Sequence, residues 1–431
     1  CIIIYEVLIE ELIKEETKNI DYLQKRGAFG LMNVRQGDGY HPESTYLSIG
    51  AGNRSIGSKL SHIGVELDDK IINPAIKSLK IRNKNSIYHS KPGLLGSKFN
   101  EADKKISVLG NCDVAGKRRR TIVTMLMDDK GEVSMGHVGK SILQKTEAPW
   151  KYETNWSKIR EYFKEYYKRS DFLVVETGDI TRIVNYYNSN TEKYKVIESK
   201  LTSAKSKVIK EVDKFIGDII NYIDLNDTMI GIIVPTPSPQ QIKNGNKLTW
   251  VLWAGKGINQ GWLSSLSTNR KGIITISDLL PSLLSFYDLP YSNLPGKPIK
   301  VIESKLKWRE LNKLNKKIYL ISKLRPIFVK GFIIFQLILI LIAIIKIWYT
   351  SVILNRIYEY ILLGLLVMPI NFLIISLYYP PGLSAYIILL FVFSIVEIYL
   401  LKRYLDTKFK RIFITTLLLT VLLISDLISG Y

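Results

Sequence analysis

The sequence predicts an α/β domain with a largely parallel sheet and helices on both faces, followed by an all-α transmembrane region of about four helices. Short apolar runs recur through the first part of the chain, and helical patterns separate them. Short apolar strands that alternate with helices imply a parallel sheet covered on both sides. From Ile327 onward the composition changes to mainly Ile, Leu, Phe and Val, which predicts membrane spans.

The expected strands are apolar runs bounded by turns or helical patterns. They are Ile2–Tyr5, Ile106–Leu109, Thr121–Met127, Phe172–Val175, Met229–Val234, Trp250–Trp253 and Gly272–Ile276. The clearest helical patterns are Asn155–Lys168 and Lys193–Ile223, in which apolar residues recur at three- and four-residue spacing. In such sheets the functional side chains gather in loops at the carboxyl ends of the strands.

A glycine-rich loop is expected at Gly27–Arg35, ahead of a helix that contains Tyr46. Glycine permits positive φ and close approach of the backbone, and Arg35 and Arg54 are the candidate anion ligands there. The segment lacks Gly-Lys-Ser/Thr and so matches no phosphate-binding P-loop. An ordinary glycine-rich turn is the alternative.

Toward the end of the α/β domain, Gly272–Ile276 is expected to run directly into a helix. Ser277 or Asp278 would cap that helix, and Pro281 is tolerated in its first turn. The expected α/β domain covers residues 1–299, and a basic juxtamembrane linker covers 300–326.

The remaining residues, 327–431, contain four apolar stretches in close succession, which identify the lipid bilayer as a partner. The expected spans are Ile327–Tyr349, Ile361–Tyr379, Leu383–Leu401 and Ile412–Ile428. The chain has no initiator Met and opens inside an apolar run, and Tyr431 closely follows an apolar helix. We therefore expect it to be truncated at both ends.

Two carboxylates, Glu397 and Asp426, fall inside the expected spans. They mark either a polar pathway or interfacial positions, and their closeness to the span ends favours the second. Five basic residues in Lys402–Arg411 favour the cytoplasm for that loop, which places residues 1–326 outside the cell. The seven basic residues of Lys307–Arg325 argue for the opposite orientation, but long domains translocate largely regardless of charge.

Composition excludes several classes of function. The net charge of +21 comes from lysines scattered along an Ile-, Lys- and Asn-rich chain, so nucleic-acid binding is not expected. Cys1 and Cys112 are the two cysteines, and two thiols so far apart form neither a disulfide framework nor a zinc site.

The segment Ser277–Leu284 looks like the late "TDxxPTLL" element of the alkaline-phosphatase-like superfamily. The order of the first strand, a helix, Gly30-Leu31-Met32-Asn33 and then Tyr46–Gly52 also resembles that superfamily, over about residues 1–290. The narrower resemblance is to its membrane-attached bacterial branch. It implies a site at the strand ends that binds one or two metal ions through Asp and His, with a nucleophilic Ser or Thr.

The chain departs from that pattern at the positions the resemblance implies for metal ligands. Glu6 and Val7 replace the usual Asp-Gly after the first strand, and Pro235–Pro239 stands where an Asp-His pair belongs. Asp179 and Arg182 replace the expected Asp and His after Phe172–Val175. The four histidines, His41, His62, His89 and His137, all precede residue 138.

The remaining metal candidates are Glu6, Asp179 and Asp278, and the resemblance places them with Pro235 near one edge of the sheet. The hydroxyl candidates Ser44, Thr45 and Ser48 are expected in the loop before the Tyr46 helix. They are nucleophiles if the site is active, and ordinary loop and capping hydroxyls otherwise.

These departures favour a non-catalytic binding or assembly module of the bacterial cell envelope, a pseudoenzyme with no expected cofactor. Its partners would be envelope proteins or an anionic envelope ligand. One alternative is a phosphate or sulfate ester hydrolase or transferase that uses a single divalent metal and altered ligands. A transporter is the third possibility and rests on the spans and their two carboxylates.

Overall fold

The computed structural model describes the chain except for residues 5, 115, 190–193, 349–351, 379–382 and 430–431. The chain divides into two compact units, Cys1–Lys313 and Leu314–Tyr431. The first unit is the α/β domain that the sequence predicts, and the second is all helical.

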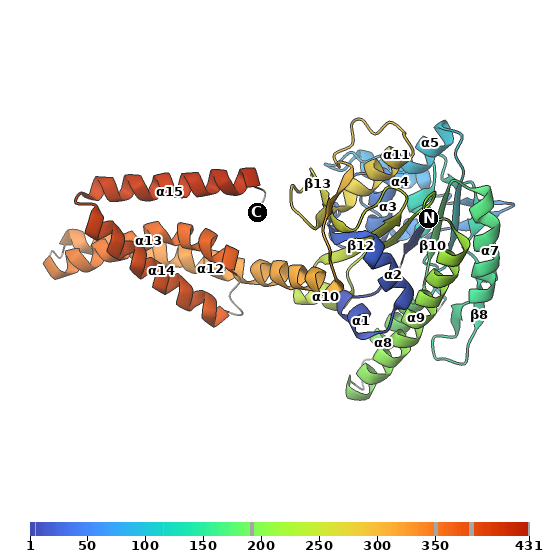
Figure 1. Cartoon of the computed structure of the whole chain (residues 1–431), viewed down its shortest axis with the longest axis horizontal. Coiled ribbons are helices and arrows are strands. Elements are labelled where there is room, and N and C mark those ends of the chain that lie inside the picture. The colour runs from blue at the N-terminus through green and yellow to red at the C-terminus, as the bar shows by residue number, and fades with distance from the viewer. Residues whose placement is uncertain (5, 115, 190–193, 349–351, 379–382, 430–431) are drawn as a thin grey trace. The chain divides into compact units, whose positions relative to one another are not determined.

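A ten-stranded sheet forms the centre of the first unit, in the order β15-β13-β2-β12-β11-β1-β10-β5-β7, with β14 paired to β2. Figure 1 shows helices packed around this sheet. Its strands are β1 (Ile2–Ile4), β2 (Ala28–Asn33), β5 (Ile106–Gly110), β7 (Met135–His137), β10 (Phe172–Glu176), β11 (Met229–Ile233), β12 (Leu248–Gly255), β13 (Gly261–Ser265), β14 (Ile273–Thr275) and β15 (Ile299–Glu303). Within the described residues, only β12 and β15 run antiparallel to their neighbours. Two small sheets flank it: β3 (Val65–Leu67), β4 (Lys70–Ile72) and β6 (Glu132–Val133), and β8 (Leu143–Lys145) with β9 (Tyr152–Thr154).

The common direction of eight strands brings their carboxyl ends to one edge of the sheet, called the carboxyl edge below. Glu6, Asp179 and Pro235 follow β1, β10 and β11, which pair in parallel. Asp278 follows β14, which is parallel to β2 and therefore has the same polarity as β11. The predicted convergence of these four residues on one edge is confirmed.

Helices cover both faces of this sheet. The helices of the first unit are α1 (Ile9–Lys14), α2 (Lys18–Arg26), α3 (Pro42–Ala51), α4 (Ile76–Lys84), α5 (Leu94–Glu101), α6 (Ile122–Leu126), α7 (Trp156–Arg169), α8 (Asp179–Asn188), α9 (Tyr194–Tyr222), α10 (Pro239–Asn244) and α11 (Leu279–Phe286). Ile2, Ile4 and Val174 pack in one core cluster with residues of α3, α5, α6 and α11. Ile3 and Val175 point to the other face, since side chains alternate along a strand, and they are equally buried.

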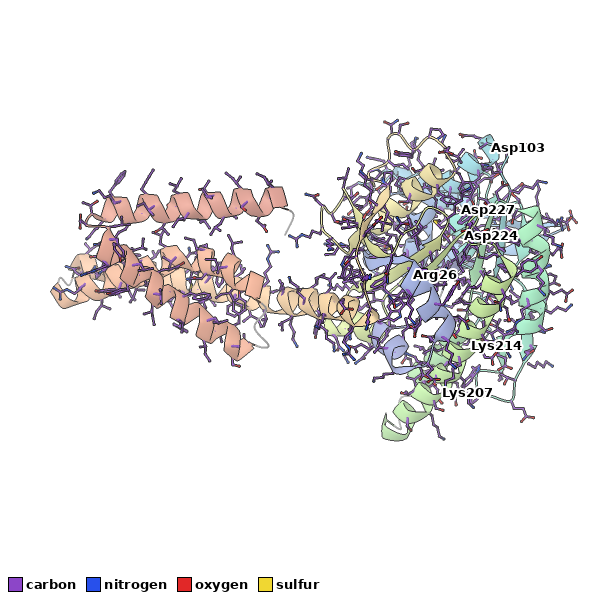
Figure 2. The ribbon with its side chains drawn as sticks, viewed as in Figure 1. Arg26, Asp103, Lys207, Lys214, Asp224 and Asp227 are labelled. Atoms are coloured by element: carbon purple, nitrogen blue, oxygen red, sulfur yellow. The ribbon has the colours of Figure 1, made fainter. Side chains whose placement is uncertain are left out.

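The long helix α9 shows why the predicted amphipathic pattern forms a covering helix. Phe215 and Ile219 are buried, whereas Lys207 and Lys214 are exposed and labelled in Figure 2. The phenyl ring of Phe215 meets that of Phe163 on α7 edge to face, 5.9 Å between centroids. The predicted helix Asn155–Lys168 is confirmed as α7, and the Asn155 side chain caps it by accepting from the Lys158 N–H.

The predicted glycine-rich loop Gly27–Arg35 is wrong, because Ala28–Asn33 forms the buried strand β2. Its glycines permit close packing inside the sheet rather than a turn. A Cβ at Gly27 would lie 2.2 Å from the carbonyl oxygen of Trp253, and one at Gly30 would lie 3.2 Å from that of Gly272. Glycine marks close backbone approach in a strand as readily as it marks a loop.

Two further predictions fail for identifiable reasons. Thr121–Met127, expected as a strand, contains the helix α6, in which every residue is buried. A short run that is apolar on all sides fits a buried helix or a buried strand equally well. Residues 300–326 are not a linker, because β15 completes one side of the sheet and a helix begins at Trp308. There the lysine content conceals the apolar positions Ile299 and Val301, which pack against the core.

The second unit contains helices long and apolar enough to cross a membrane. They are α12 (Trp308–Trp348, which begins in the first unit), α13 (Val352–Tyr378), α14 (Leu383–Tyr404) and α15 (Lys408–Ser429). Many apolar side chains, such as Ile347 and Leu427, are not covered by protein, as expected for helices that face lipid. The predicted membrane region is confirmed.

A carboxylate ties three of these helices together at one end. Glu359, near the start of α13, accepts from Arg411 Nη1 at 2.9 Å and lies 3.6 and 3.7 Å from the amines of Lys402 and Lys408. The end of α12 is on the same side, since the Lys346 amine lies 4.1 Å from the centre of the Tyr358 ring. The end of α12, the start of α13 and the segment that joins α14 to α15 therefore lie together.

Candidate functional site at the carboxyl edge of the sheet

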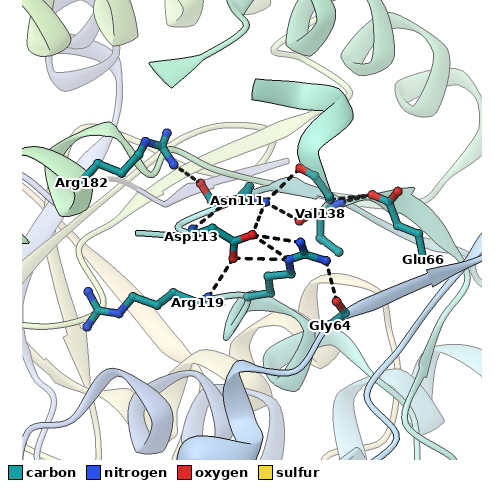
Figure 3. A network of polar contacts seen from close by, with 9 residues as sticks. Gly64, Glu66, Asn111, Asp113, Arg119, Val138 and Arg182 are labelled. Atoms are coloured by element: carbon teal, nitrogen blue, oxygen red, sulfur yellow. Dashed lines mark hydrogen bonds and ion pairs between the residues drawn. The ribbon is translucent and has the colours of Figure 1, made fainter. Parts of the chain in front are cut away.

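A buried ion pair lies where α8 begins. Asp179 is the first residue of α8 and Arg182 lies one turn later, with 4% and 1% of their side chains exposed. Arg182 Nη2 donates to Asp179 Oδ1 at 2.7 Å and to Thr154 Oγ1 at 3.1 Å, while Nη1 donates to the Asn111 carbonyl at 2.8 Å (Figure 3). Asp179 Oδ1 also accepts from the Thr154 N–H at 2.9 Å. The guanidinium thus joins the ends of β5 and β9 to α8.

A second buried carboxylate, Glu176, ends β10. Its Oε1 accepts a hydrogen bond from the Tyr46 hydroxyl, and its Oε2 has no hydrogen-bond partner within the described part of the chain. Burial raises the pKa of Glu176 to about 7, and the neighbouring Glu6 carboxylate adds to that rise. Interactions with Tyr46, Cys112 and Arg119 lower the pKa of Glu176 and partly oppose that rise. Burial also raises the pKa of the Cys112 thiol well above its ordinary value, so this thiol is protonated at neutral pH.

A third carboxylate, Asp113, holds the loop after β5 in place through hydrogen bonds to two arginines (Figure 3). Its Oδ2 accepts from Arg120 Nη2 at 2.9 Å and from Nε at 3.2 Å, and its Oδ1 accepts from the Arg119 N–H at 2.8 Å. Arg120 Nη1 also donates to the Gly64 carbonyl at 2.8 Å. This network fixes the basic run Lys117–Arg120 beside the carboxyl edge.

Glu66 holds the backbone at the end of β7. Its Oε1 accepts from the N–H groups of Val138 and Gly139 at 2.7 and 2.6 Å (Figure 3). The His137 ring, whose Nδ1 lies 3.8 Å from Glu66 Oε1, and the two backbone N–H groups lower the pKa of Glu66 to about 2. Glu66 is therefore ionised at neutral pH and held by partners within the protein.

Asp278 is completely buried and both of its oxygens are occupied. Oδ2 accepts from the Ser265 hydroxyl and the Thr275 N–H, each at 2.7 Å. Oδ1 accepts from the Ser267 hydroxyl at 2.5 Å and the Lys297 N–H at 3.0 Å. Asp278 is the N-cap residue of α11 by position, but its side chain makes no capping bond to that helix. It joins β13, β14 and the segment before β15 instead.

The resemblance implies a metal ion, and the side chains present do not fit one. Asp179 and Asp278 are engaged by protein donors, and Glu6 Oε2 accepts from the Thr181 hydroxyl at 2.5 Å. Throughout the described residues no group of three or more His, Cys, Asp or Glu side chains is placed to hold a metal ion. At this edge Asp179 and Asp113 are instead neutralised by the guanidinium groups of Arg182 and Arg120.

The three hydroxyl candidates lie in the first two turns of α3, not in a loop before it, because Pro42 starts the helix. All three side chains are completely buried. Ser44 Oγ accepts from the Gly57 N–H at 2.8 Å, and Ser48 Oγ accepts from the Ser55 N–H at 2.9 Å. Thr45 Oγ1 donates to the His41 carbonyl at 3.1 Å. These bonds hold the loop after α3 against the helix.

The anion-ligand candidates Arg35 and Arg54 lie around the ring of Tyr40. Burial raises the pKa of the Tyr40 hydroxyl, and the positive charges of the two arginines oppose that rise. The Lys247 amine lies 5.3 Å from the centre of the same ring, and the Arg54 guanidinium lies over Tyr88 at 5.7 Å. Arg35 and Lys247 are exposed. Among described side chains none of the three cations has a carboxylate within salt-bridge distance.

The sequence did not identify Glu176, Asn111 or Asp113 as part of this site. A usable signal was present, since Glu176 directly follows the predicted strand Phe172–Val175 and the other two closely follow Ile106–Leu109. Polar residues that follow parallel strands meet at one edge. Their hydrogen-bond partners, however, come from segments far away in the chain.

No protein-family model matches the chain, and no curated protein matches its sequence. Comparison with solved structures finds 27 matching chains. The PH0037 protein from Pyrococcus horikoshii is 16% identical, with a TM-score of 0.40 over 67% of this chain and 96% of that one. The lipoteichoic acid synthase LtaP from Listeria monocytogenes is 10% identical, with a TM-score of 0.43 over 69% of this chain and 74% of that one.

A third structure, BT33494S-sulf, comes from work on the metabolism of glycosaminoglycans by Bacteroides thetaiotaomicron. It is 10% identical, with a TM-score of 0.35 over 66% of this chain and 68% of that one. At identities of 16% or less and TM-scores below 0.5, these similarities carry no argument about the superfamily or the activity of this chain.

Proposed function

We propose that the first unit is a non-catalytic binding or assembly module of the cell envelope, carried on a multi-pass membrane anchor. The observation that supports this most directly is the buried pair of Asp179 and Arg182. A carboxylate that would serve as a metal ligand is bound to a guanidinium instead. The guanidinium has N–H donors but no acceptor atom that could bind a metal ion. The charge of Asp179 is balanced within the protein itself.

The hydroxyl groups support the same function. Transfer of a phosphoryl or sulfuryl group requires an accessible nucleophile and cations that stabilise the attacking and leaving oxygens. Ser44, Thr45 and Ser48 have no exposed surface, and their hydroxyl groups bind the backbone. Substrate would reach them only if the start of α3 unfolded.

Cations at the carboxyl edge, of which Arg35 and Lys247 are exposed, fit an anionic envelope ligand. Arg35, Arg54 and Lys247 surround Tyr40 at the ends of β2, α3 and the start of β12. Arginine binds phosphate, sulfate and carboxylate groups through paired donors, and an aromatic ring beside it adds a surface for stacking. The ligand would be a polyanion or an acidic protein surface of the envelope.

We expect purified full-length protein to bind no stoichiometric zinc and to hydrolyse generic phosphate and sulfate esters no faster than background. The reason is the commitment of Asp179 and Asp278 to protein donors. Metal content by mass spectrometry and turnover of nitrophenyl phosphate and nitrophenyl sulfate check this. Turnover that a chelator abolishes, and that is also lost in Glu6→Ala, would instead support the metal-dependent hydrolase.

The proposal also places residues 1–326 outside the cell and Lys402–Arg411 in the cytoplasm. We expect a membrane-impermeant maleimide to label Lys105→Cys in intact cells, and Thr407→Cys only after permeabilisation. Both positions are exposed, and Cys1→Ser in the background removes the more accessible native thiol. Labelling of Thr407→Cys but not Lys105→Cys in intact cells would reverse the orientation.

A further inference from the structure

The membrane unit contains a polar contact between two of its spans. Asn371 on α13 donates from Nδ2 to Glu397 Oε2 on α14 at 2.9 Å and to Ser394 Oγ at 3.0 Å. Asn371 is completely buried, and Ser394 is 9% exposed. Glu397 lies seven residues before Tyr404, the last residue of α14, which is about 10 Å along the helix axis. The contact is therefore inside the apolar stretch.

One acceptor at this contact, the side-chain carbonyl oxygen of Asn371, has no hydrogen-bond donor among the described residues. The two N–H groups of the Asn371 amide are used by Glu397 and Ser394. Its carbonyl oxygen Oδ1 is buried and has no hydrogen-bond partner among the residues that the structure describes. A buried acceptor without a donor carries a large penalty, and most of all in hydrocarbon, where no water is present to satisfy it.

A cation resolves the imbalance. A proton on the Glu397 carboxyl group provides an O–H donor for Asn371 Oδ1, which pairs acid and amide through two hydrogen bonds. A sodium ion would instead bind Oδ1, a carboxylate oxygen and Ser394 Oγ, all of them the oxygen donors that hard cations prefer. Either ligand also neutralises a carboxylate that is costly to keep charged within a membrane.

We propose that Asn371, Ser394 and Glu397 form a binding site for one small monovalent cation, H⁺ or Na⁺, between α13 and α14. The site gives the membrane unit a role beyond anchoring. It is independent of the function proposed for the first unit, since all three residues lie in the second.

The test uses full-length protein in lipid nanodiscs and follows thermal unfolding in two series. One series varies pH in choline chloride, and the other replaces choline with sodium at constant pH. A site for one cation changes the unfolding equilibrium constant by up to about tenfold per pH unit, or per tenfold change in sodium concentration. We expect Glu397→Gln to fold and to lose this dependence, because its neutral amide provides Asn371 Oδ1 with a donor at any pH.

Asp426→Asn is the matched control, because it removes an exposed carboxylate from another span and leaves the dependence unchanged. A pH dependence that Glu397→Gln loses, without a sodium dependence, identifies a proton. A sodium dependence that Glu397→Gln loses, with or without a pH dependence, identifies a sodium site. Identical behaviour of wild type and Glu397→Gln in both series overturns the proposal. If Glu397→Gln does not fold, Asn371→Ala tests the proposal in its place. The apparent cation affinity of Asn371→Ala must then be at least about tenfold lower than that of wild type (about 1.4 kcal/mol).

Discussion

Arg182→Met is expected to lower the free energy of unfolding of the first unit by about 3–5 kcal/mol, because it leaves the carboxylate of Asp179 buried without its cation. The substitution keeps most of the side-chain volume, so the loss reports charge and hydrogen bonding rather than a cavity. It also removes the donors to Asn111 and Thr154. Denaturant unfolding of the full-length protein, followed by tryptophan fluorescence, to which the buried Trp250 contributes, measures the change.

Arg160→Met is the matched control for this experiment. Arg160 pairs with Asp218 at the surface, and exposed pairs contribute less than about 1 kcal/mol. The double variant Arg182→Met with Asp179→Asn is expected to recover part of the lost stability, since no buried charge remains. A loss below about 1 kcal/mol in Arg182→Met would mean that the pair contributes as little as a surface one.

Glu176→Gln is expected to remove a pH dependence of about 3 kcal/mol from the stability of the first unit. In the folded protein the pKa of Glu176 is about 7, above the value near 4.3 of an unfolded chain, so folding favours the protonated acid. This contribution is complete below about pH 4.3 and is lost as the pH rises through 7. Wild type should therefore lose more stability than Glu176→Gln between pH 4.5 and 7.5, by that amount.

All other titratable groups are the same in wild type and Glu176→Gln. Their contributions to the pH dependence of stability therefore cancel when the two proteins are compared. Glu161→Gln provides a control at an exposed carboxylate that pairs with Lys158. It should follow the wild-type curve throughout. Parallel stability curves for wild type and Glu176→Gln would show that Glu176 is ionised in the folded protein at acidic pH, which contradicts the burial argument.

Much of the fold was predictable because its signals are local in the chain. Apolar runs such as Met229–Ile233 can only be buried, and the spacing in Trp156–Arg169 fits only a helix. The four membrane helices were predicted from length and composition, which is sufficient where the solvent is lipid. The failures fell where local signals conflict, at the glycines of β2 and in the lysine-rich β15.

The candidate site was predictable in position but not in its bonding. Parallel strand direction fixes where the residues after β1, β10 and β11 must lie, so Glu6 and Asp179 were correctly placed on one edge. What each carboxylate binds depends on residues that the sequence does not bring together. Asp179 meets Thr154 of another strand, and Asp278 meets Lys297 nineteen residues later.

The sequence by itself therefore determined the fold class, the membrane helices and the shared edge, since periodicity, composition and strand direction depend on near neighbours. Only the tertiary structure decided the protonation and partners of the buried groups. Glu176 shows the reason, because its pKa depends on the water excluded by surrounding segments and on Tyr46, which is 130 residues away. Glu397 stands out in the sequence as a carboxylate inside a span, but it forms a candidate cation site with Asn371 only because α13 and α14 pack together.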